Sequence, residues 1–192
     1  MGIEFEMKFC ATAQTQAALA ARFPGAWQTI AMETTYYDTP DRILGQRMMT
    51  LRRRLENGES VCTVKTPESG GARGEWDCKC EDIRQALPEL CKLGGPEILL
   101  SAGDRLEVVC GARFTRKAIL ITTEDFTAEL ALDSGVLIGG GRETPLCEVE
   151  LELKSGDREA LMLYARVLAS RFHLTPERKS KFVRAMELAQ GL

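Results

Sequence analysis

The sequence is poor in the residues on which several common kinds of site depend. It contains one histidine, His173, and none of its seven cysteines lies in a CxxC motif of the kind that binds zinc or carries redox chemistry. A formal net charge of −3 gives no overall basic excess of the kind that nucleic-acid-binding domains show. No apolar run approaches the ~20 residues of a membrane-spanning helix. We therefore expect a cytoplasmic protein with free thiols and with no nucleic-acid or membrane partner.

Linkers and low-complexity segments are also missing, and the balance of residues is that of an ordinary folded protein. Hydrophobic residues make up 44% and charged residues 28% of the 192 positions, which is enough apolar material for a core. We expect residues 1–192 to form one domain. The composition leaves the oligomeric state open, with a homodimer as one possibility.

Alternating polar and apolar residues predict a chain built mainly of β-strands. The extended segments expected are 3–10, 28–38, 49–55, 60–66, 73–80, 106–117, 118–123, 127–133 and 145–154. Short turn sequences separate them, including Asn57-Gly58, which is typical of a tight hairpin, and Asp133-Ser134-Gly135. Helical periodicity appears at 12–23, 82–93, 157–172 and 177–190. Together these patterns predict an α+β fold with an antiparallel sheet.

The charged residues of the strands are sorted by sign. Because residues i and i+2 of a strand share a face, Glu148, Glu150 and Glu152 point together on the last strand, whereas Arg52 and Arg54 point together on a middle one. A solvent-exposed face explains any one such strand, but not the sorting across several strands. Carboxylates are the oxygen ligands that Mg²⁺ and Mn²⁺ prefer, and arginine and lysine bind phosphate oxygens. The sequence therefore predicts a site for a metal–polyphosphate complex on one face of the sheet.

Several motifs, in order along the chain, resemble the signature of one family. They are Glu4-Phe5-Glu6-Met7-Lys8, which is similar to an ExExK motif, then Tyr36-Tyr37-Asp38-Thr39-Pro40, Leu51-Arg52-Arg53-Arg54, Thr63-Val64-Lys65, Arg73-Gly74-Glu75, Arg116, Glu129 to Asp133, Cys147 to Leu153 and Ser180-Lys181. By these motifs the chain resembles the CYTH, or triphosphate tunnel metalloenzyme, superfamily, and it looks closest to the bacterial inorganic triphosphatases. The resemblance implies a closed eight-stranded antiparallel β-barrel, a tunnel with a charged interior and helices packed outside. It also implies divalent-metal-dependent chemistry on triphosphates.

The charge pattern and the resemblance together give a set of expected site residues. The carboxylates expected to hold one or two Mg²⁺ or Mn²⁺ ions are Glu4, Glu6, Glu129, Asp133, Glu148, Glu150 and Glu152. The cations expected to bind the phosphate chain are Lys8, Arg52, Arg54, Lys65, Arg73, Arg113, Arg116 and Lys181. Of all these, the residues expected to be catalytic are Glu4, Glu6, Lys8, Glu148 and Glu150.

Some of these assignments have alternatives. Many relatives carry a basic residue two positions before the arginine that matches Arg116, but this chain has Phe114 there. Arg113 replaces it only if a bulge turns Arg113 to the same face of the strand. The alternative for Lys181 is a solvated lysine of a basic helix, and the alternative for Arg73 is a structural ion pair with Glu75.

The function predicted is hydrolysis of inorganic tripolyphosphate to pyrophosphate and phosphate. No aromatic residue other than Phe114 lies two positions from a site residue on its strand face, where it could stack on an organic group. A class IV-like adenylate cyclase or a thiamine triphosphatase is the alternative enzyme. A further alternative is a module that binds polyphosphate or a nucleotide without turnover.

Overall fold

The computed structural model describes residues 2–67 and 73–192, with the side chains of residues 2–4 and 73 left aside. Within these ranges ten strands form one antiparallel sheet, in the order β1-β6-β5-β4-β3-β7-β8-β9-β2-β10. The strands are β1 (Gly2–Glu4), β2 (Glu6–Cys10), β3 (Gln28–Asp38), β4 (Thr50–Glu56), β5 (Glu59–Pro67), β6 (Arg73–Lys79), β7 (Glu107–Thr122), β8 (Phe126–Gly139), β9 (Arg142–Gly156) and β10 (Thr175–Pro176). The helices are α1 (Ala13–Arg22), α2 (Ile83–Lys92), α3 (Ile98–Ala102), α4 (Arg158–Phe172) and α5 (Lys181–Gln190), with short 3₁₀ turns η1 (Gly45–Arg47) and η3 (Gly103–Arg105). The α+β content is as predicted.

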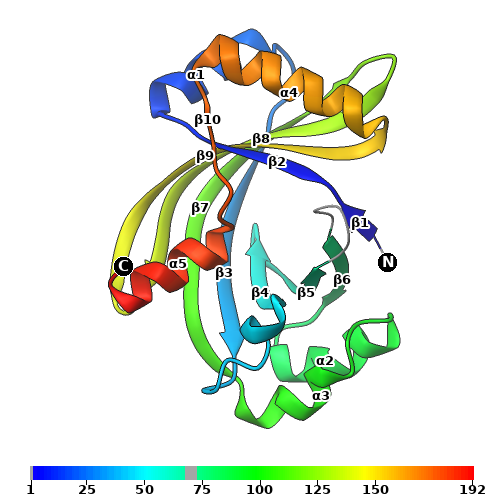
Figure 1. Ribbon diagram of the computed structural model, residues 1–192, viewed down its shortest axis with the longest axis vertical. Helices are drawn as coiled ribbons and strands as arrows, with labels where there is room; N and C mark the ends of the chain where they lie inside the picture. Colours follow the sequence, from blue (N-terminus) through cyan, green and yellow to red (C-terminus); the bar gives the residue numbers. More distant parts are fainter. Residues whose placement is uncertain (1, 68–72) are drawn as a thin grey trace.

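The sheet is strongly curved (Figure 1) but open, so the prediction of a closed eight-stranded barrel is wrong. Its edge strands are β1 and β10, and no hydrogen-bonded pairing joins these two strands in the described part of the chain. Alternation of polar and apolar residues predicts which side chains share a face, but not whether the outermost strands pair with each other. The expected strand 3–10 is in fact split at Phe5, because β1 pairs with β6 whereas β2 pairs with β9.

Several strand boundaries also differ from the prediction. The segments 106–117 and 118–123 form the single strand β7, and β8 continues through Asp133-Ser134-Gly135, which was expected to turn. Gly135 is needed there for a different reason, since an added Cβ would lie 2.2 Å from the carbonyl oxygen of Arg113 on β7. The turn at Asn57-Gly58 is confirmed, with positive φ angles of 51° and 90°.

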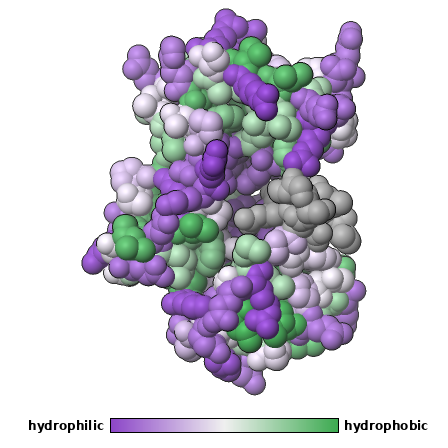
Figure 2. Space-filling model, in the orientation of Figure 1, coloured by the Kyte–Doolittle hydropathy of each residue, from purple (hydrophilic) through white to green (hydrophobic). Residues whose placement is uncertain are grey.

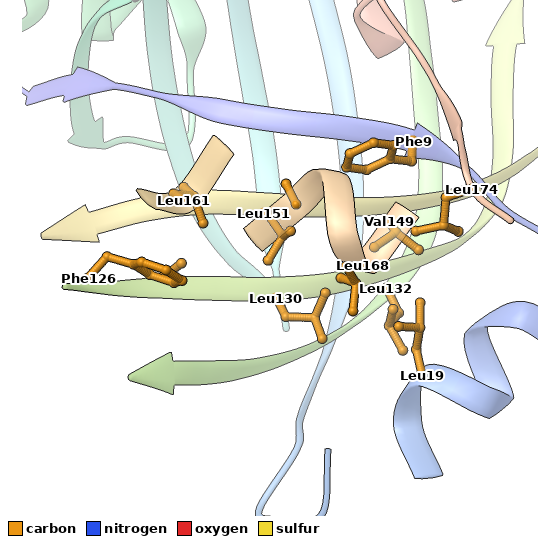
Figure 3. Close-up of a cluster of buried hydrophobic side chains, with 12 residues drawn as sticks. Phe9, Leu19, Phe126, Leu130, Leu132, Val149, Leu151, Leu161, Leu168 and Leu174 are labelled. Carbon is orange, nitrogen blue, oxygen red and sulfur yellow. The ribbon is translucent and has the colours of Figure 1, made fainter. Parts of the chain in front are cut away.

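Two apolar layers cover the outer side of the sheet. Helices α1 and α4 pack over β2, β8 and β9, and Figure 3 shows Leu19 of α1 beside Leu132 of β8. Helices α2 and α3 cover β4, β5 and β6 in the same way. Of the predicted helices, α1, α2 and α4 form nearly as expected, and side chains of Thr12, Asp82 and Asp157 cap their N-termini. The short helix α3 was not expected.

Helix α5 has a different place. It begins at Lys181, later than the predicted residue 177, because Ser180 caps its first turn by accepting a hydrogen bond from the Val183 N–H. Its Ala185 packs with Leu137 of β8 and Leu146 of β9. Those two side chains belong to the same alternating face as Glu148 of β9, so α5 lies against the charged side of the sheet rather than the side covered by α4.

No helix in the described ranges is long and apolar enough to cross a membrane. The face of the molecule drawn in Figure 2 is mainly hydrophilic, with smaller apolar patches between the charged groups.

Candidate functional site

A cavity of about 420 Å³ lies on the charged side of the curved sheet. The expected site residues that line it are Glu6, Lys8, Arg52, Arg54, Lys65, Arg116, Glu129, Glu150, Glu152 and Lys181. They come from β2, β4, β5, β7, β8, β9 and α5, so the fold brings most of the expected set together from positions far apart in the chain. The side chains of Glu4 and Arg73 lie outside the described residues.

Three carboxylates, Asp133, Glu148 and Glu150, form what we call the acid cluster. Asp133 of β8 faces Glu148 of β9 across the strand pair, and Glu150 is the next residue on the same face of β9. One oxygen from each side chain lies within 4.8 Å of the others. All three residues are buried, and Asp133 and Glu148 have no exposed surface. Their mutual repulsion would be large without cations among them.

Lys181 supplies the central cation. Its Nζ lies 2.8 Å from Asp133 Oδ2, 2.6 Å from Glu148 Oε2 and 2.6 Å from Glu150 Oε1. The approach to Glu148 Oε2 does not have hydrogen-bond geometry, and this buried oxygen accepts no hydrogen bond from the described residues. The alternative of a solvated Lys181 is therefore wrong.

Two arginines complete the ion pairs. Arg116 of β7 donates from Nε to Asp133 Oδ1 at 2.8 Å and from Nη2 to Asp133 Oδ2 at 2.7 Å, and it also contacts Glu150. Arg184 of α5 contacts the remaining oxygen of Glu148. Arg184 was not among the expected residues, but its spacing of three from Lys181 on one helix was a usable signal, because such residues lie side by side.

Burial and charge act in opposite directions on these groups. Burial raises the pKa of Glu148, with Lys181 partly opposing it. Burial also opposes ionisation of Glu150, but Lys181 and Arg116 outweigh it and hold the pKa of that carboxyl well below 4.5. Conversely, burial alone would lower the pKa of Lys181, yet Glu150 and the other two carboxylates raise it above 10.5. Lys181 and Glu150 are therefore both ionised near neutral pH.

A second wall of the cavity is basic. Arg52 and Arg54 of β4 and Lys65 of β5 line it, with Glu75 of β6 between Arg52 and Lys65 at 3.4 Å and 3.3 Å. Arg54 is buried, donates from Nε to Thr34 Oγ1 at 3.0 Å, and lies 3.8 Å from Glu56. Burial lowers the pKa of Arg54 to about 10, and the neighbouring Arg52 and Arg116 lower it as well. A bound anion would stabilise this concentration of positive charge.

The aromatic ring of Phe114 lies under three of the cations that face the cavity. Its centroid is 5.2 Å from Lys181 Nζ and 6.0 Å from the guanidinium carbons of both Arg54 and Arg116, within the range of cation–π attraction. The structure does not bring Arg113 to this place. Arg113 is on the outer face of β7, where it is exposed and pairs with Glu143 at 3.0 Å.

Arg53 points away from Arg52 and Arg54, as the alternation of side chains along a strand requires, and donates to the carbonyl oxygen of Glu81. Lys8 of β2 also lines the cavity, directly opposite Glu150 of β9 in the register, with its Nζ 3.2 Å from Glu6 Oε1. Burial lowers the pKa of Lys8, but Glu6 and Glu150 more than compensate, and the net shift is upward. Lys8 is therefore a protonated donor.

Comparison with known proteins points to one family. Residues 2–186 match the sequence model of the CYTH domain. An inorganic triphosphatase of Haemophilus influenzae is 31% identical over 145 residues, which are 73% of this chain and 41% of that protein. The chain thus spans less than half the length of this relative.

Solved structures show the same fold at low sequence identity. A putative adenylyl cyclase from Hippeastrum, described as having a dominant triphosphatase activity, superposes with a TM-score of 0.67 at 16% identity, covering 100% of this chain and 96% of that one. A protein from Pyrococcus horikoshii gives 0.66 at 20% identity, covering 96% and 99%. A putative adenylate cyclase from Bacillus halodurans gives 0.60 at 17% identity, covering 93% and 94%.

Proposed function

The chain belongs to the CYTH domain family, and from this premise we propose that it is a divalent-metal-dependent triphosphatase that cleaves inorganic tripolyphosphate to pyrophosphate and phosphate. The observation that carries the proposal is the division of charge across one cavity. Arg52, Arg54 and Lys65 line one wall, and Glu6, Glu129, Glu150 and Glu152 line the other, where Glu150 also belongs to the buried acid cluster. A metal–triphosphate complex carries the complementary charges. Its negative phosphate oxygens suit the arginines and lysines, and its metal cation suits the carboxylates. The inorganic triphosphatase of Haemophilus influenzae supports the choice of reaction.

The acid cluster fits Mg²⁺ or Mn²⁺. Its donors are carboxylate oxygens, which these hard cations prefer, and three of them converge within 4.8 Å. Glu148 Oε2 is buried and accepts no hydrogen bond from the described residues, and the cation beside it is the Lys181 ammonium at 2.6 Å, so a metal ligated by this oxygen would share it with Lys181 or displace that group. Glu152 of β9 and Glu6 of β2 face each other in the register and extend the row of carboxylates along the cavity. A divalent cation held there would neutralise charge on the phosphate oxygens and lower the pKa of a water bound to it.

The chain's own residues contribute mainly binding and charge. Phosphoryl transfer has a loose transition state with charge spread over the equatorial oxygens, so positioned donors stabilise it directly. Arg52 and Arg54 present planar donor groups from one side, and Lys8 and Lys65 present ammonium groups. Since the pKa of Lys8 is raised, it stays charged and holds a phosphate oxygen rather than removing a proton from water.

Cleavage of an organic triphosphate is the second candidate. The cavity wall includes Tyr36 and Phe182, two aromatic residues that the strand pattern did not associate with the site. Their rings pack against each other with centroids 5.2 Å apart, and Tyr36 is buried. Because each ring already packs against the other, this pair offers less stacking surface for a base than two separate rings would.

The test is a phosphate-release assay on tripolyphosphate, ATP and thiamine triphosphate, with Mg²⁺, with Mn²⁺ and with a chelator, and with the products resolved by chromatography. We expect kcat/KM to be highest for tripolyphosphate and release to stop with the chelator. Cyclic AMP formed from ATP faster than phosphate from tripolyphosphate would replace the hydrolase with a cyclase. Thermal stabilisation by all three compounds without turnover would indicate a binding module.

A further inference from the structure

The side-chain amide of Gln16 on α1 joins the backbones of two acid-cluster residues from the outer side of the sheet. Its Nε2 donates to the carbonyl oxygen of Asp133 and to that of Glu148, both at 2.9 Å. These residues face each other across β8 and β9. An amide nitrogen carries two hydrogens, so Gln16 uses both of them on this one cross-strand pair.

The surroundings of Gln16 make this contact stand out. Helix α1 otherwise packs through Leu19, one turn further on, which contacts the apolar layer that includes Leu132 and Val149 (Figure 3). Those two residues are the next pair along β8 and β9. A partly buried amide in such a place is unfavourable unless it is hydrogen-bonded. The two bonds therefore hold Gln16 in place, and they equally hold the two strands.

Gln16 bridges the two residues whose separation sets the distance between two carboxylates of the acid cluster. The side chains of Asp133 and Glu148 extend to the opposite face of the sheet, where their carboxylates converge with that of Glu150. Like charges this close repel one another, which favours separation of the strands or rotation of the side chains. A bridge between the two carbonyl oxygens opposes the first of these movements, because it fixes the distance between the backbones from which the carboxylates extend.

We propose that Gln16 is a positioning residue that sets the spacing of the acid cluster and thereby its affinity for a divalent cation. The inference rests on the proposed function for the identity of that cation as the metal of a triphosphatase. Gln16 does not reach the cavity and touches neither metal nor substrate. Residues that orient metal ligands in this way typically change metal affinity by roughly 10- to 100-fold when they are replaced.

The experiment compares Mn²⁺ binding to the substrate-free protein, measured by titration calorimetry, in three variants. Gln16→Met keeps the length and the helical preference of the side chain but removes both donors, and Gln16→Glu places a carboxylate against two carbonyl oxygens. Gln14→Ala, an exposed glutamine of the same helix, is the matched control. We expect the Kd for Mn²⁺ to rise about tenfold or more in Gln16→Met and further in Gln16→Glu, and to stay unchanged in Gln14→Ala.

Kinetics and stability separate positioning from a merely structural role. In Gln16→Met the Mn²⁺ concentration for half-maximal phosphate release should rise in step with the Kd, whereas KM for tripolyphosphate at saturating Mn²⁺ should stay near that of the wild type. A lowered Tm with an unchanged Kd for Mn²⁺ would overturn the proposal. So would a wild type that binds no Mn²⁺, or loss of folding in both Gln16 variants, which would make the amide a requirement of the fold itself. A wild type that binds Mn²⁺ but releases no phosphate would refute the triphosphatase, while the Mn²⁺ affinities would still decide the role of Gln16.

Discussion

Lys181 places its ammonium group 2.6 Å from a carboxylate oxygen of Glu150, although the two residues are 31 positions apart in the chain. Both side chains are nearly inaccessible, at 6% and 9% exposure. The same nitrogen also lies within 2.8 Å of Asp133 and Glu148. Lys181 therefore provides, in the middle of the acid cluster, the positive charge that a divalent cation would otherwise provide.

Replacing Lys181 by methionine should destabilise the protein and strengthen its binding of Mn²⁺. Removing one partner of a buried ion pair leaves uncompensated charge and costs about 3–5 kcal/mol, and Mn²⁺ can neutralise the three carboxylates left behind. We expect a lower Tm without metal and a larger rise of Tm on adding Mn²⁺ than in the wild type, measured by thermal unfolding. Lys179→Met is the control, because Lys179 is exposed and its ammonium group pairs with Glu187 rather than with the acid cluster. Equal Mn²⁺ shifts in wild type and Lys181→Met would contradict this prediction.

Glu150 should make the folded protein sensitive to acid. Its pKa is held well below 4.5, whereas an unfolded glutamate titrates near ~4.3. A group with a lowered pKa contributes stability above its unfolded pKa and loses that contribution as the pH falls through the folded pKa. Glu148, whose pKa is raised, has the opposite sign, because its ionisation between ~4.3 and its folded pKa disfavours the folded state.

The test is urea unfolding of wild type and Glu150→Gln from roughly pH 7 down to roughly pH 3. We expect the variant to be less stable by about 3 kcal/mol or more near neutral pH, with the difference shrinking as the pH falls below ~4. Glu124→Gln, at an exposed position between β7 and β8, should follow the wild type throughout. A difference that stays constant over the whole range would show that folding does not shift the pKa of Glu150.

Arg52→Ala and Arg54→Ala should each reduce kcat/KM for tripolyphosphate. A hydrogen bond to a charged group contributes about 1.5–3 kcal/mol, which corresponds to a loss of roughly ten- to a hundred-fold, with both a higher KM and a lower kcat. Arg53→Ala is the control on the other face of β4, where Arg53 donates to the Glu81 carbonyl, and it should cost far less. Equal losses at all three positions would show that the basic wall does not act on the substrate.

Glu148→Gln and Glu6→Gln should abolish phosphate release but leave tripolyphosphate binding without metal largely intact. The carboxylates are proposed to hold the metal, whereas the cations of β4 and β5 hold the phosphate chain. Turnover is measured by phosphate release and binding by the rise in Tm with tripolyphosphate in the presence of a chelator. Wild-type turnover in either variant would contradict the assignment of that residue.

The local pattern of the sequence was enough to determine which side chains share a face. Val149 and Glu150 are adjacent, and the first packs under α4 while the second faces the cavity, because successive residues of a strand point to opposite sides. The hairpin at Asn57-Gly58 and the outward direction of Arg53 follow from equally short-range rules. The sorting of acidic and basic residues among strands was readable for the same reason.

Only the tertiary structure decided how these faces meet. Nothing in the alternation of residues states whether β1 and β10 pair, that Phe5 separates two strands with different partners, or that Gly135 allows close contact with β7 rather than a turn. Nor does it state that Lys181 and Arg184 of α5 reach the acid cluster, or that Gln16 holds the same cluster from behind. These relationships depend on contacts between residues far apart in the chain, and their geometry is set by the curvature of the sheet and the packing of helices on its two sides, which a period of two residues does not encode.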